Sequence, residues 1–382
     1  MDTFQEVTSE SWFGRLGSSC GSVIFGIVLI VVSAVALWWN EGRAVTTARS
    51  LAEGGKAVVS VGADKIEPTN EGKLVHVTGE ATSKDAVKDA DYGVSAPSPS
   101  LRLVRKVEMY QWSESSKTET QTKIGGGTEK KTTYTYTKAW SSTLNKSSEF
   151  KQPNGHQNPP SMPESKSFFS TSATLGAYKL SDSLLGKIDA AQSVTPEAKT
   201  VNASPQGATM RVVSNQLYKG ADPNQPGVGD VRITYTYAGP TAVSVVAQQA
   251  SGGFCPYQTK SGDALEMLSP GSVSADQMFK QAADSNNMLT WILRGVGWLL
   301  MTIGIAALFS PLSTFASVLP FLGDIVGFGA FLFALVAGFA ISTTIIAVAW
   351  IAYRPLVGVG LLAAVICVLY FAKKVGTNRR TS

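Results

Sequence analysis

Histidine supplies catalytic bases and metal ligands more often than any other residue near neutral pH, and this chain of 382 residues contains two. His76 lies in the strand-like segment KLVHVTG, and His156 lies in a proline-rich stretch. Neither has the H-x-x-x-H or C-x-x-C spacing that gathers metal ligands. Asp263, in KSGD, has no identifiable carboxylate partner and is typical of a turn. These three residues are weak candidates, and the sequence predicts no catalytic residue, cofactor or metal.

Two other features that could do chemistry are weaker still. Gly125-Gly126-Gly127 lacks the Lys-Ser/Thr and the following helix of a phosphate-binding loop, so we interpret it as the tip of a β-hairpin. The one match to G-x-S-x-G, from Gly17 to Gly21, leads directly into the first apolar run and is not the strand-to-helix elbow that presents a nucleophile. The net charge of +5 is spread along the chain, which argues against nucleic acid as a partner.

The elements that must position these residues include membrane helices. Gly21 to Trp39 is a nineteen-residue run without charge, and three more apolar runs lie between Met288 and Ala372. About 20 apolar residues at 1.5 Å per residue match the roughly 30 Å hydrocarbon core of a bilayer. We therefore predict four transmembrane helices and a large β-rich (α+β) extracytoplasmic domain inserted between helices 1 and 2. The expected segments are 1–20 (cytoplasmic), 21–39, 289–309, 324–352 and 355–372 (transmembrane), 40–288 (β-rich), 310–323 (apolar cytoplasmic-side linker) and 373–382 (basic tail).

Basic residues that flank membrane spans set the orientation, since they are retained in the cytoplasm. The tail residues are expected to meet anionic headgroups there, and four crossings then place both termini in the cytoplasm. These membrane-surface basic residues are Lys373, Lys374, Arg379 and Arg380. A cleaved signal peptide is the alternative for the first run, but acidic residues outnumber Arg15 before it. The segment TFQEVTSESWFGRLG predicts an interfacial helix on the cytoplasmic leaflet.

The middle segment is patterned mostly as strands. Residues 101–122 and 132–140 flank the triple glycine and predict one long antiparallel hairpin. Further strands are expected at 57–62, 74–79, 208–218, 231–238 and 243–249, and short helices at 182–188 and 274–284. Cys255 is the single cysteine of this segment, so no disulfide within it can hold it together.

Small residues recur at four-residue spacing in the apolar runs, which lets helices approach closely within one chain or between copies. The candidate helix-packing residues are Gly17, Gly21, Ser22, Gly26, Gly323, Gly327, Ala334 and Gly338. In the third span, Ser342, Thr343 and Thr344 are candidates either for lining a pore or for hydrogen bonding between helices. The charges in the spans lie at their ends, with Arg294 near the start of the second and Asp324 at the start of the third, and none is interior as in coupled transporters.

The chain resembles the transmembrane protein 43 family, also called LUMA. The resemblance lies in blocks that follow one another in order from about Ser11 to Leu356. They include SWFGRLG, WWNEGRAVTTARSL, NEGKLVHVTGE, DYGV, RKVEMYQWSE, YTYTKAW, GHQNPPSMP, VGDVRITYTYAG, KSGDALEML, RGVGWLLMTIG and YRPL. It implies four spans with a lumenal domain between the first two. Eukaryotic members are associated with the endoplasmic reticulum and the inner nuclear membrane, where they organise the membrane and bind envelope proteins and themselves. The family offers no catalytic residue to carry over.

The function expected from these features is that of a non-enzymatic membrane scaffold. It would self-associate as a homo-oligomer and organise the bilayer, with membrane or envelope proteins as partners of its extracytoplasmic domain. In a bacterium it would lie in the cytoplasmic membrane. One alternative is an oligomeric passive ion channel or channel modulator, sensitive to changes at Ser342 or Thr344. A second is a membrane-anchored enzyme acting on lipid or envelope material, which requires His156, His76 and Asp263 to converge.

Overall fold

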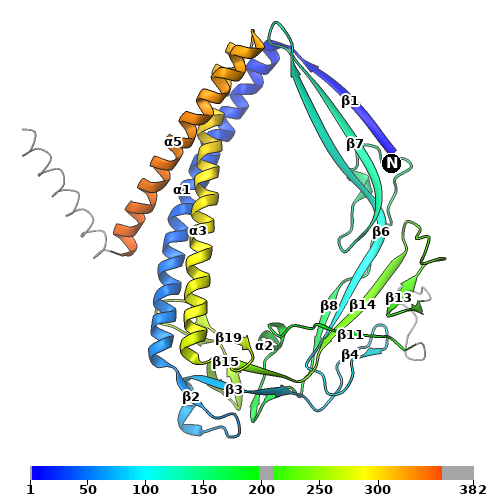
Figure 1. The fold of residues 1–382 in the computed structure, drawn as a ribbon, viewed down its shortest axis with the longest axis vertical. Helices are drawn as coiled ribbons and strands as arrows, with labels where there is room; N and C mark the ends of the chain where they lie inside the picture. The colour runs from blue at the N-terminus through cyan, green and yellow to red at the C-terminus, as the bar shows by residue number, and fades with distance from the viewer. Residues whose placement is uncertain (1, 198–209, 355–382) are drawn as a thin grey trace, which may run out of the picture. The chain divides into compact units, whose positions relative to one another are not determined.

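A computed structural model describes residues 2–197 and 210–354 of the chain (Figure 1). The chain divides into two compact units. We call residues 1–6, 51–118 and 132–280 the β-rich unit, and residues 7–50, 119–131 and 281–382 the helical unit. The β-rich unit therefore differs from the predicted domain 40–288, because the outer part of the long hairpin groups with the helices.

The helical unit is built on three long helices, α1 (Trp12–Ala57), α3 (Ala275–Leu308) and α5 (Pro320–Tyr353). Each is long and apolar enough to cross a membrane, and they lie side by side in Figure 1. The short helix α4 (Ser310–Ala316) joins α3 to α5. These helices contain the first three predicted spans, except that α3 ends at Leu308, one residue before the predicted end of the second. The fourth predicted span, 355–372, and the basic tail lie outside the described residues.

Helix α1 is much longer than the apolar run that predicted it. Its 46 residues span about 69 Å at 1.5 Å per residue. The extension after Trp39, NEGRAVTTARSLAEGGKA, is rich in Ala, Arg, Glu and Leu, which are good helix formers. In the same way α3 absorbs the short helix predicted at 274–284. Both helices continue beyond the apolar runs because polar residues end the part that can lie in the membrane, whereas the backbone hydrogen bonds of the helix do not depend on apolar side chains.

The first part of the N-terminal segment forms a strand where an interfacial helix was expected, and the helix begins only at Trp12. β1 (Asp2–Glu10) joins a sheet next to β7 (Thr128–Ser141). Phe4 stacks on Tyr134 with ring centroids 6.1 Å apart, and Glu6 pairs with Lys151 at 2.8 Å. Burial alternates along this strand, since Phe4 and Glu6 are half-buried and their neighbours are exposed, and contacts with β7 decide between the two structures.

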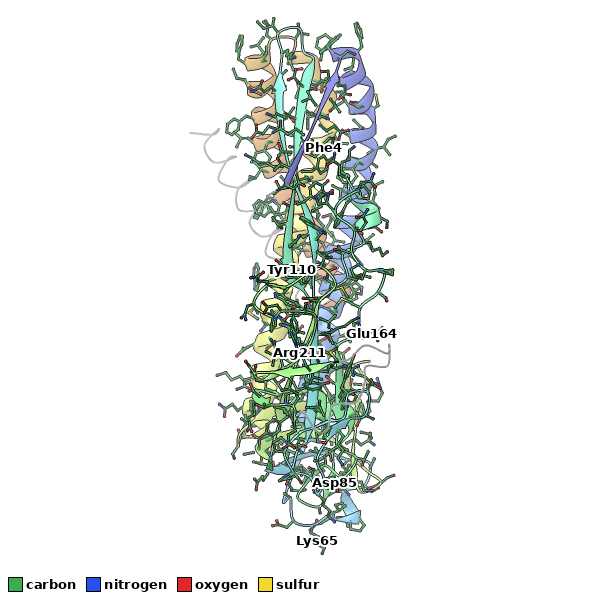
Figure 2. All side chains as sticks on the ribbon, turned by 90° about the vertical axis from the view of Figure 1, so that its right-hand side faces the viewer. Phe4, Lys65, Asp85, Tyr110, Glu164 and Arg211 are labelled. Carbon is green, nitrogen blue, oxygen red and sulfur yellow. The ribbon has the colours of Figure 1, made fainter. Side chains whose placement is uncertain are left out.

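The first sheet of the β-rich unit has eight strands in the order β1-β7-β6-β14-β13-β12, with β8 on β6 and β11 on β14. The long ribbon of β6 and β7 confirms the predicted hairpin, and Tyr110, labelled in Figure 2, lies on β6. The predicted strand 208–218 divides in two around Ser214, whose φ is 56°. The bounds are β6 (Arg102–Thr122), β8 (Lys166–Phe169), β11 (Gln192–Val194), β12 (Arg211–Val213), β13 (Gln216–Lys219) and β14 (Val231–Ala238).

The second sheet has seven strands in the order β19-β15-β16-β10-β9-β3-β2, and β15 also pairs with β3. Its core includes Val75, Val77, Val245 and Leu175, with Leu184 from the short helix α2 (Asp182–Gly186). The strands predicted at 57–62, 74–79 and 243–249 are confirmed as β2, β3 and β15. The bounds are β2 (Val59–Val61), β3 (Leu74–Thr82), β9 (Thr174–Leu175), β10 (Tyr178–Lys179), β15 (Thr241–Ala250), β16 (Gly253–Cys255) and β19 (Met267–Pro270), and two small hairpins are β4 (Lys88–Asp89) with β5 (Val94–Ser95) and β17 (Tyr257–Gln258) with β18 (Ala264–Leu265).

Candidate functional site

Helices α1, α3 and α5 pack through glycines at their closest points. A Cβ added to Gly26 would lie 2.6 Å from the carbonyl oxygen of Gly304, and one added to Gly304 would lie 2.9 Å from that of Gly26. A Cβ on Gly338 of α5 would lie 2.8 Å from Oγ1 of Thr302 on α3. Small residues therefore let these helices approach to backbone contact, which is a common way for helices to associate in lipid.

A buried ion pair ties the same three helices together. The carboxylate of Glu41 on α1 is fully buried and accepts from Nε and Nη2 of Arg294 on α3, at 2.6 and 2.8 Å. Its Oε2 also accepts from Nε1 of Trp350 on α5, at 2.8 Å. The guanidinium of Arg294 lies 4.7 Å from the ring centroid of Trp291. This fork geometry satisfies both charges, which makes a buried pair tolerable away from water.

A second polar group joins α1 to α3 one turn further along. Arg43 donates to the side-chain oxygens of Asn286 and Thr290, at 2.9 and 3.0 Å. Asn40 donates to the backbone carbonyl of Thr290, and Asn286 donates to that of Ala44. Through these hydrogen bonds, the polar side chains that follow the apolar run of α1 and precede that of α3 bind the two helices to each other.

This network was not predicted from the sequence, in which Glu41 and Arg43 simply follow the first apolar run and Arg294 lies near the start of the second. The usable signal was that opposite charges lie at the corresponding ends of two adjacent antiparallel spans. Such charges are expected to pair, because an unpaired charge near hydrocarbon is costly.

The predicted small-residue sites fall into two groups. Gly26, Ala334 and Gly338 are buried between helices, and Gly323 packs on Ser317 near the α4–α5 junction. By contrast, among residues 2–197 and 210–354, a Cβ added to Gly17 or Gly21 would meet no atom within 4 Å beyond the neighbouring backbone of α1 itself. Ser22 is half-buried, and a Cβ on Gly327 would meet Ser313 at 3.9 Å. The Gly17 and Gly21 face of α1 is thus open.

The three hydroxyl residues of α5 do not share one environment. Thr343 and Thr344 are exposed and donate to the carbonyls of Phe339 and Ala340 in their own helix, at 2.7 and 2.8 Å. Ser342 is 3% exposed, and its Oγ has no hydrogen-bond partner among the described residues. The hydrogen-bonding capacity of both threonine hydroxyls is therefore met within their own helix.

The two histidines are held by different partners. His76, on β3, lies 3.2 Å from the hydroxyl of Ser60 and 2.9 Å from the carbonyl of Val273. His156 is 4% exposed; its Nδ1 lies 2.9 Å from the carbonyl of Gln152 and its Nε2 lies 3.2 Å from Oδ2 of Asp2. All four ring nitrogens thus have partners within the β-rich unit, so neither ring needs a substrate to be satisfied.

Aromatic packing fixes His156 further. Its ring stacks on Tyr136 with centroids 3.9 Å apart and meets the edge of Trp112 at 4.6 Å. Burial and the hydrogen bond to Glu114 raise the pKa of Tyr136 to about 12, so its hydroxyl remains a neutral donor. Asp263 lies in the turn between β17 and β18, where its carbonyl accepts from the Thr259 hydroxyl at 2.7 Å. The structure shows no hydrogen bond between any two of His76, His156 and Asp263 within the part of the chain that it describes.

The glycine tip of the hairpin packs within the helical unit. The amide of Gly125 donates to the carbonyl of Val318 at 3.0 Å, and Arg15 donates to the carbonyl of Gly126. A Cβ added to Gly126 would lie 2.3 Å from the Trp12 ring. The tip therefore contacts residues 12–15 of α1 and Val318 within that unit. At roughly 3.3 Å per residue, the 21 residues of β6 span about 69 Å.

These observations define the class as a membrane protein with at least three candidate spanning helices and a large β-rich unit. Over residues 2–197 and 210–354, no three His, Cys, Asp or Glu side chains gather where they could hold a metal ion.

The chain belongs to the transmembrane protein 43 family. The family model "Transmembrane protein 43" matches residues 109–355. The chain is 35% identical to transmembrane protein 43 of Rattus norvegicus over 367 residues, which cover 92% of this chain and 90% of the relative. It is 34% identical to the Homo sapiens protein, covering 90% and 87%, and 30% identical to the Drosophila melanogaster homolog, covering 89% and 91%. No solved structure matches the chain.

Proposed function

We propose that this chain is a non-enzymatic integral membrane scaffold that self-associates through the outer face of α1. The observation that carries the proposal is the face around Gly17 and Gly21, where, in the described part of the chain, no atom beyond the neighbouring backbone of α1 lies within 4 Å of an added Cβ. The other glycine contacts, such as Gly26 with Gly304, are already used to pack the helices of one chain. Close approach of a second helix needs small residues that are free, and this pair supplies them.

The open face continues along α1 as an apolar stripe. Ile24, Val28 and Val35 follow the glycines at helical spacing and are 66%, 52% and 63% exposed. Such residues face lipid or another helix, because both environments are apolar. Together with the two glycines, they form a surface on which a second copy of α1 can pack.

The β-rich unit is proposed as the binding domain for membrane or envelope proteins. What supports a binding role over an enzymatic one is the engagement of both histidines in contacts within the unit. For a eukaryotic cell the proposed location is the endoplasmic reticulum and inner nuclear membrane, and for a bacterium the cytoplasmic membrane.

Self-association can be tested with Cys20, which is exposed on α1 beside the open face. In a Cys255→Ser, Cys367→Ser background, a short bifunctional maleimide added to native membranes is expected to yield a crosslinked dimer. Gly17→Leu with Gly21→Leu should reduce that yield at least tenfold, because the added side chains separate the helices. Gly329→Leu is the matched control, since Gly329 on α5 is also exposed with nothing near an added Cβ.

A monomeric Cys20 product in native membranes, or a dimer that survives both leucines at Gly17 and Gly21, would overturn the scaffold proposal. Loss of the dimer in the Gly329→Leu control as well would also count against it, because the effect would not belong to the α1 face.

The proposed topology places the end of α1 around Cys20, the linker 310–323 and the C-terminal tail in the cytoplasm, and residues 51–118 and 132–280 of the β-rich unit outside it. It can be tested with the native Cys20 as the single cysteine, with Lys65→Cys or Ile124→Cys in a cysteine-free background, and with a maleimide that cannot cross membranes; all three positions are exposed. The proposal requires Cys20 and Lys65→Cys to react from opposite sides. Ile124→Cys at the hairpin tip should react from the Cys20 side, because the tip contacts Val318 and Arg15. Reaction of Cys20 and Lys65→Cys from the same side would exclude this topology.

A further inference from the structure

A strongly polar pocket of about 220 Å³ lies within the helical unit. Arg15, Ser19 and Ser22 line it from one face of α1, since residues three to four apart share a helix face. Thr128 and Lys130 line it from the hairpin, and further residues come from the start of α4. Seven of its ten lining residues carry a hydroxyl group.

The charges around the pocket favour an anion. Two cations, Arg15 and Lys130, face one carboxylate, Glu10. That carboxylate already accepts from the Ser18 hydroxyl at 2.9 Å and lies 3.8 Å from Nζ of Lys130. Nη1 of Arg15 donates to the carbonyl of Gly126 and to the Ser317 hydroxyl. Its Nη2 and Nε make no hydrogen bond among the described residues. The pocket therefore keeps donors for an added acceptor, with a net charge of one positive unit.

One buried hydroxyl in this pocket has no partner. Thr128 is 5% exposed, and its Oγ1 makes no hydrogen bond in the part of the chain that the structure describes. Buried hydroxyls are nearly always hydrogen-bonded in folded proteins, so an unpaired one that lines a polar pocket indicates a missing oxygen-bearing ligand. This observation is independent of the charges.

We propose that this pocket binds a phosphate group. A phosphate presents several acceptor oxygens, and it is matched by clustered hydroxyl donors with a guanidinium and an ammonium group. A metal cation fits poorly, because Arg15 and Lys130 would repel it. The volume is below the roughly 300 Å³ at which pockets for drug-sized ligands begin, which suits a headgroup phosphate or the free ion.

The surroundings favour a phospholipid as the source of the phosphate. Phe13, Leu312 and Phe315 are 77%, 55% and 62% exposed in the same unit. Trp12 packs against Phe13 and Phe315 and donates its indole N–H to the carbonyl of Thr314, whose side chain lines the pocket. Amphipathic aromatic residues beside exposed apolar ones are typical of the headgroup level of a bilayer.

Native mass spectrometry of the full chain in detergent tests the proposal. Dioleoyl phosphatidic acid should be retained, and dioleoylglycerol, which has the same acyl chains without phosphate, should not. Lys130→Gln and Thr128→Val should each weaken retention about tenfold, the effect of losing one hydrogen bond to a charged group. Lys131→Gln, a change of the same charge at the adjacent exposed residue, should leave it unchanged.

Thr128→Val also separates binding from folding. Valine fills the volume of threonine without an unpaired hydroxyl, so the variant should unfold at or above the temperature of the parent chain while losing the ligand. Competition by millimolar inorganic phosphate would identify the free ion as a second ligand of the same site. Equal retention of the two lipids, or retention unaffected by both Thr128→Val and Lys130→Gln, would overturn the proposal. Neither result bears on Cys20 crosslinking, which tests the scaffold separately.

Discussion

Each unit of this molecule buries a carboxylate between an arginine and an aromatic donor, and the two clusters differ in what depends on them. In the helical unit, Glu41 is held by Arg294 and Trp350. In the β-rich unit, the fully buried Asp89 accepts from Nη1 of Arg105 and from the Tyr235 hydroxyl, both at 2.7 Å. The same set of partners thus stabilises a buried carboxylate in two settings, between helices and in the core of the β-rich unit.

The cluster in the sheet has reserve partners. Arg105 also lies 3.0 Å from Asp91 and donates through Nε to the carbonyl of Glu164, at 3.0 Å. Burial lowers the pKa of Arg105, but the hydrogen bond to Asp91 and the charge of Asp89 outweigh it and raise that pKa above its ordinary value. Loss of one neighbour leaves this guanidinium with others.

The cluster among the helices has no such reserve. Among the described residues, both hydrogen bonds of Arg294 go to Glu41. Because Glu41, Arg294 and Trp350 lie on three different helices, this one carboxylate fixes the relative rotation of all three. The number of alternative partners of each arginine, more than the burial of the carboxylate, should therefore decide how much each ion pair contributes to the free energy of unfolding.

The largest expected effect is that of Arg294→Met. It leaves Glu41 buried without its cation, and we expect a loss of about 3–5 kcal/mol in the free energy of unfolding. Denaturant unfolding of the full chain in detergent, followed by tryptophan fluorescence, measures it. The double change Glu41→Met, Arg294→Met should recover most of the loss, because no unpaired charge remains. Additive losses in the double variant would show that the two residues act separately.

Asp89→Asn should cost less, about 1.5–3 kcal/mol, because Arg105 retains Asp91 and Glu164 as acceptors. The same unfolding experiment measures it. Asp91→Asn is the control, since the Asp91 side chain is 46% exposed and its ion pair should contribute less than about 1 kcal/mol. If Asp89→Asn destabilised the chain as much as Arg294→Met, the argument from redundancy would fail.

Gly304→Ala tests whether the helical unit also depends on close backbone contact. Its new Cβ would lie 2.9 Å from the Gly26 carbonyl oxygen, so we expect a loss of about 1–3 kcal/mol from overpacking. Gly295→Ala on the same helix meets no atom within 4 Å and should stabilise the chain by up to about 1 kcal/mol, because alanine favours helix. Thermal unfolding in detergent compares the two, and changes of the same sign would contradict the packing described here.

The smallest expected effect lies at Glu108 in the β-rich unit. Burial raises the pKa of Glu108, but hydrogen bonds from Arg232 and Lys106 outweigh it and hold that pKa below its ordinary value of 4.5. A carboxyl with a lowered folded-state pKa stabilises the fold above that ordinary value and loses its contribution as the pH falls below it. Unfolding measured between pH 6 and 3 should therefore depend less on pH in Glu108→Gln. An unchanged pH profile would show that the contacts of Glu108 with Arg232 and Lys106 do not contribute to the stability of the fold.

Much of the fold could be predicted from periodicity. The strands of β14 and β15 and the hairpin of β6 and β7 follow alternating residues and bounding glycines or prolines, which are local signals. The transmembrane protein 43 resemblance, confirmed by the relatives, came from ordered blocks along the chain. The apolar runs also predicted the cores of α1, α3 and α5, because length and composition suffice for that.

The remaining features depend on contacts between distant residues. β1 is a strand because it pairs with β7, which begins 118 residues after β1 ends, and no local signal marks that partner. The Glu41–Arg294 pair joins positions 253 residues apart. The unpaired hydroxyl of Thr128 is visible only when helix and hairpin are assembled, so the polar pocket could not be anticipated from the sequence.

The bond from one carboxylate to two neighbouring helices has a mechanical consequence. The uncharged run of α1 is about 28 Å long at 1.5 Å per residue, close to the thickness of an average hydrocarbon layer. In a thinner bilayer such a helix leans over. Because Glu41 hydrogen-bonds to α3 and to α5, the three helices would tilt together as one rigid group. Their common tilt angle would then depend on the thickness of the surrounding bilayer.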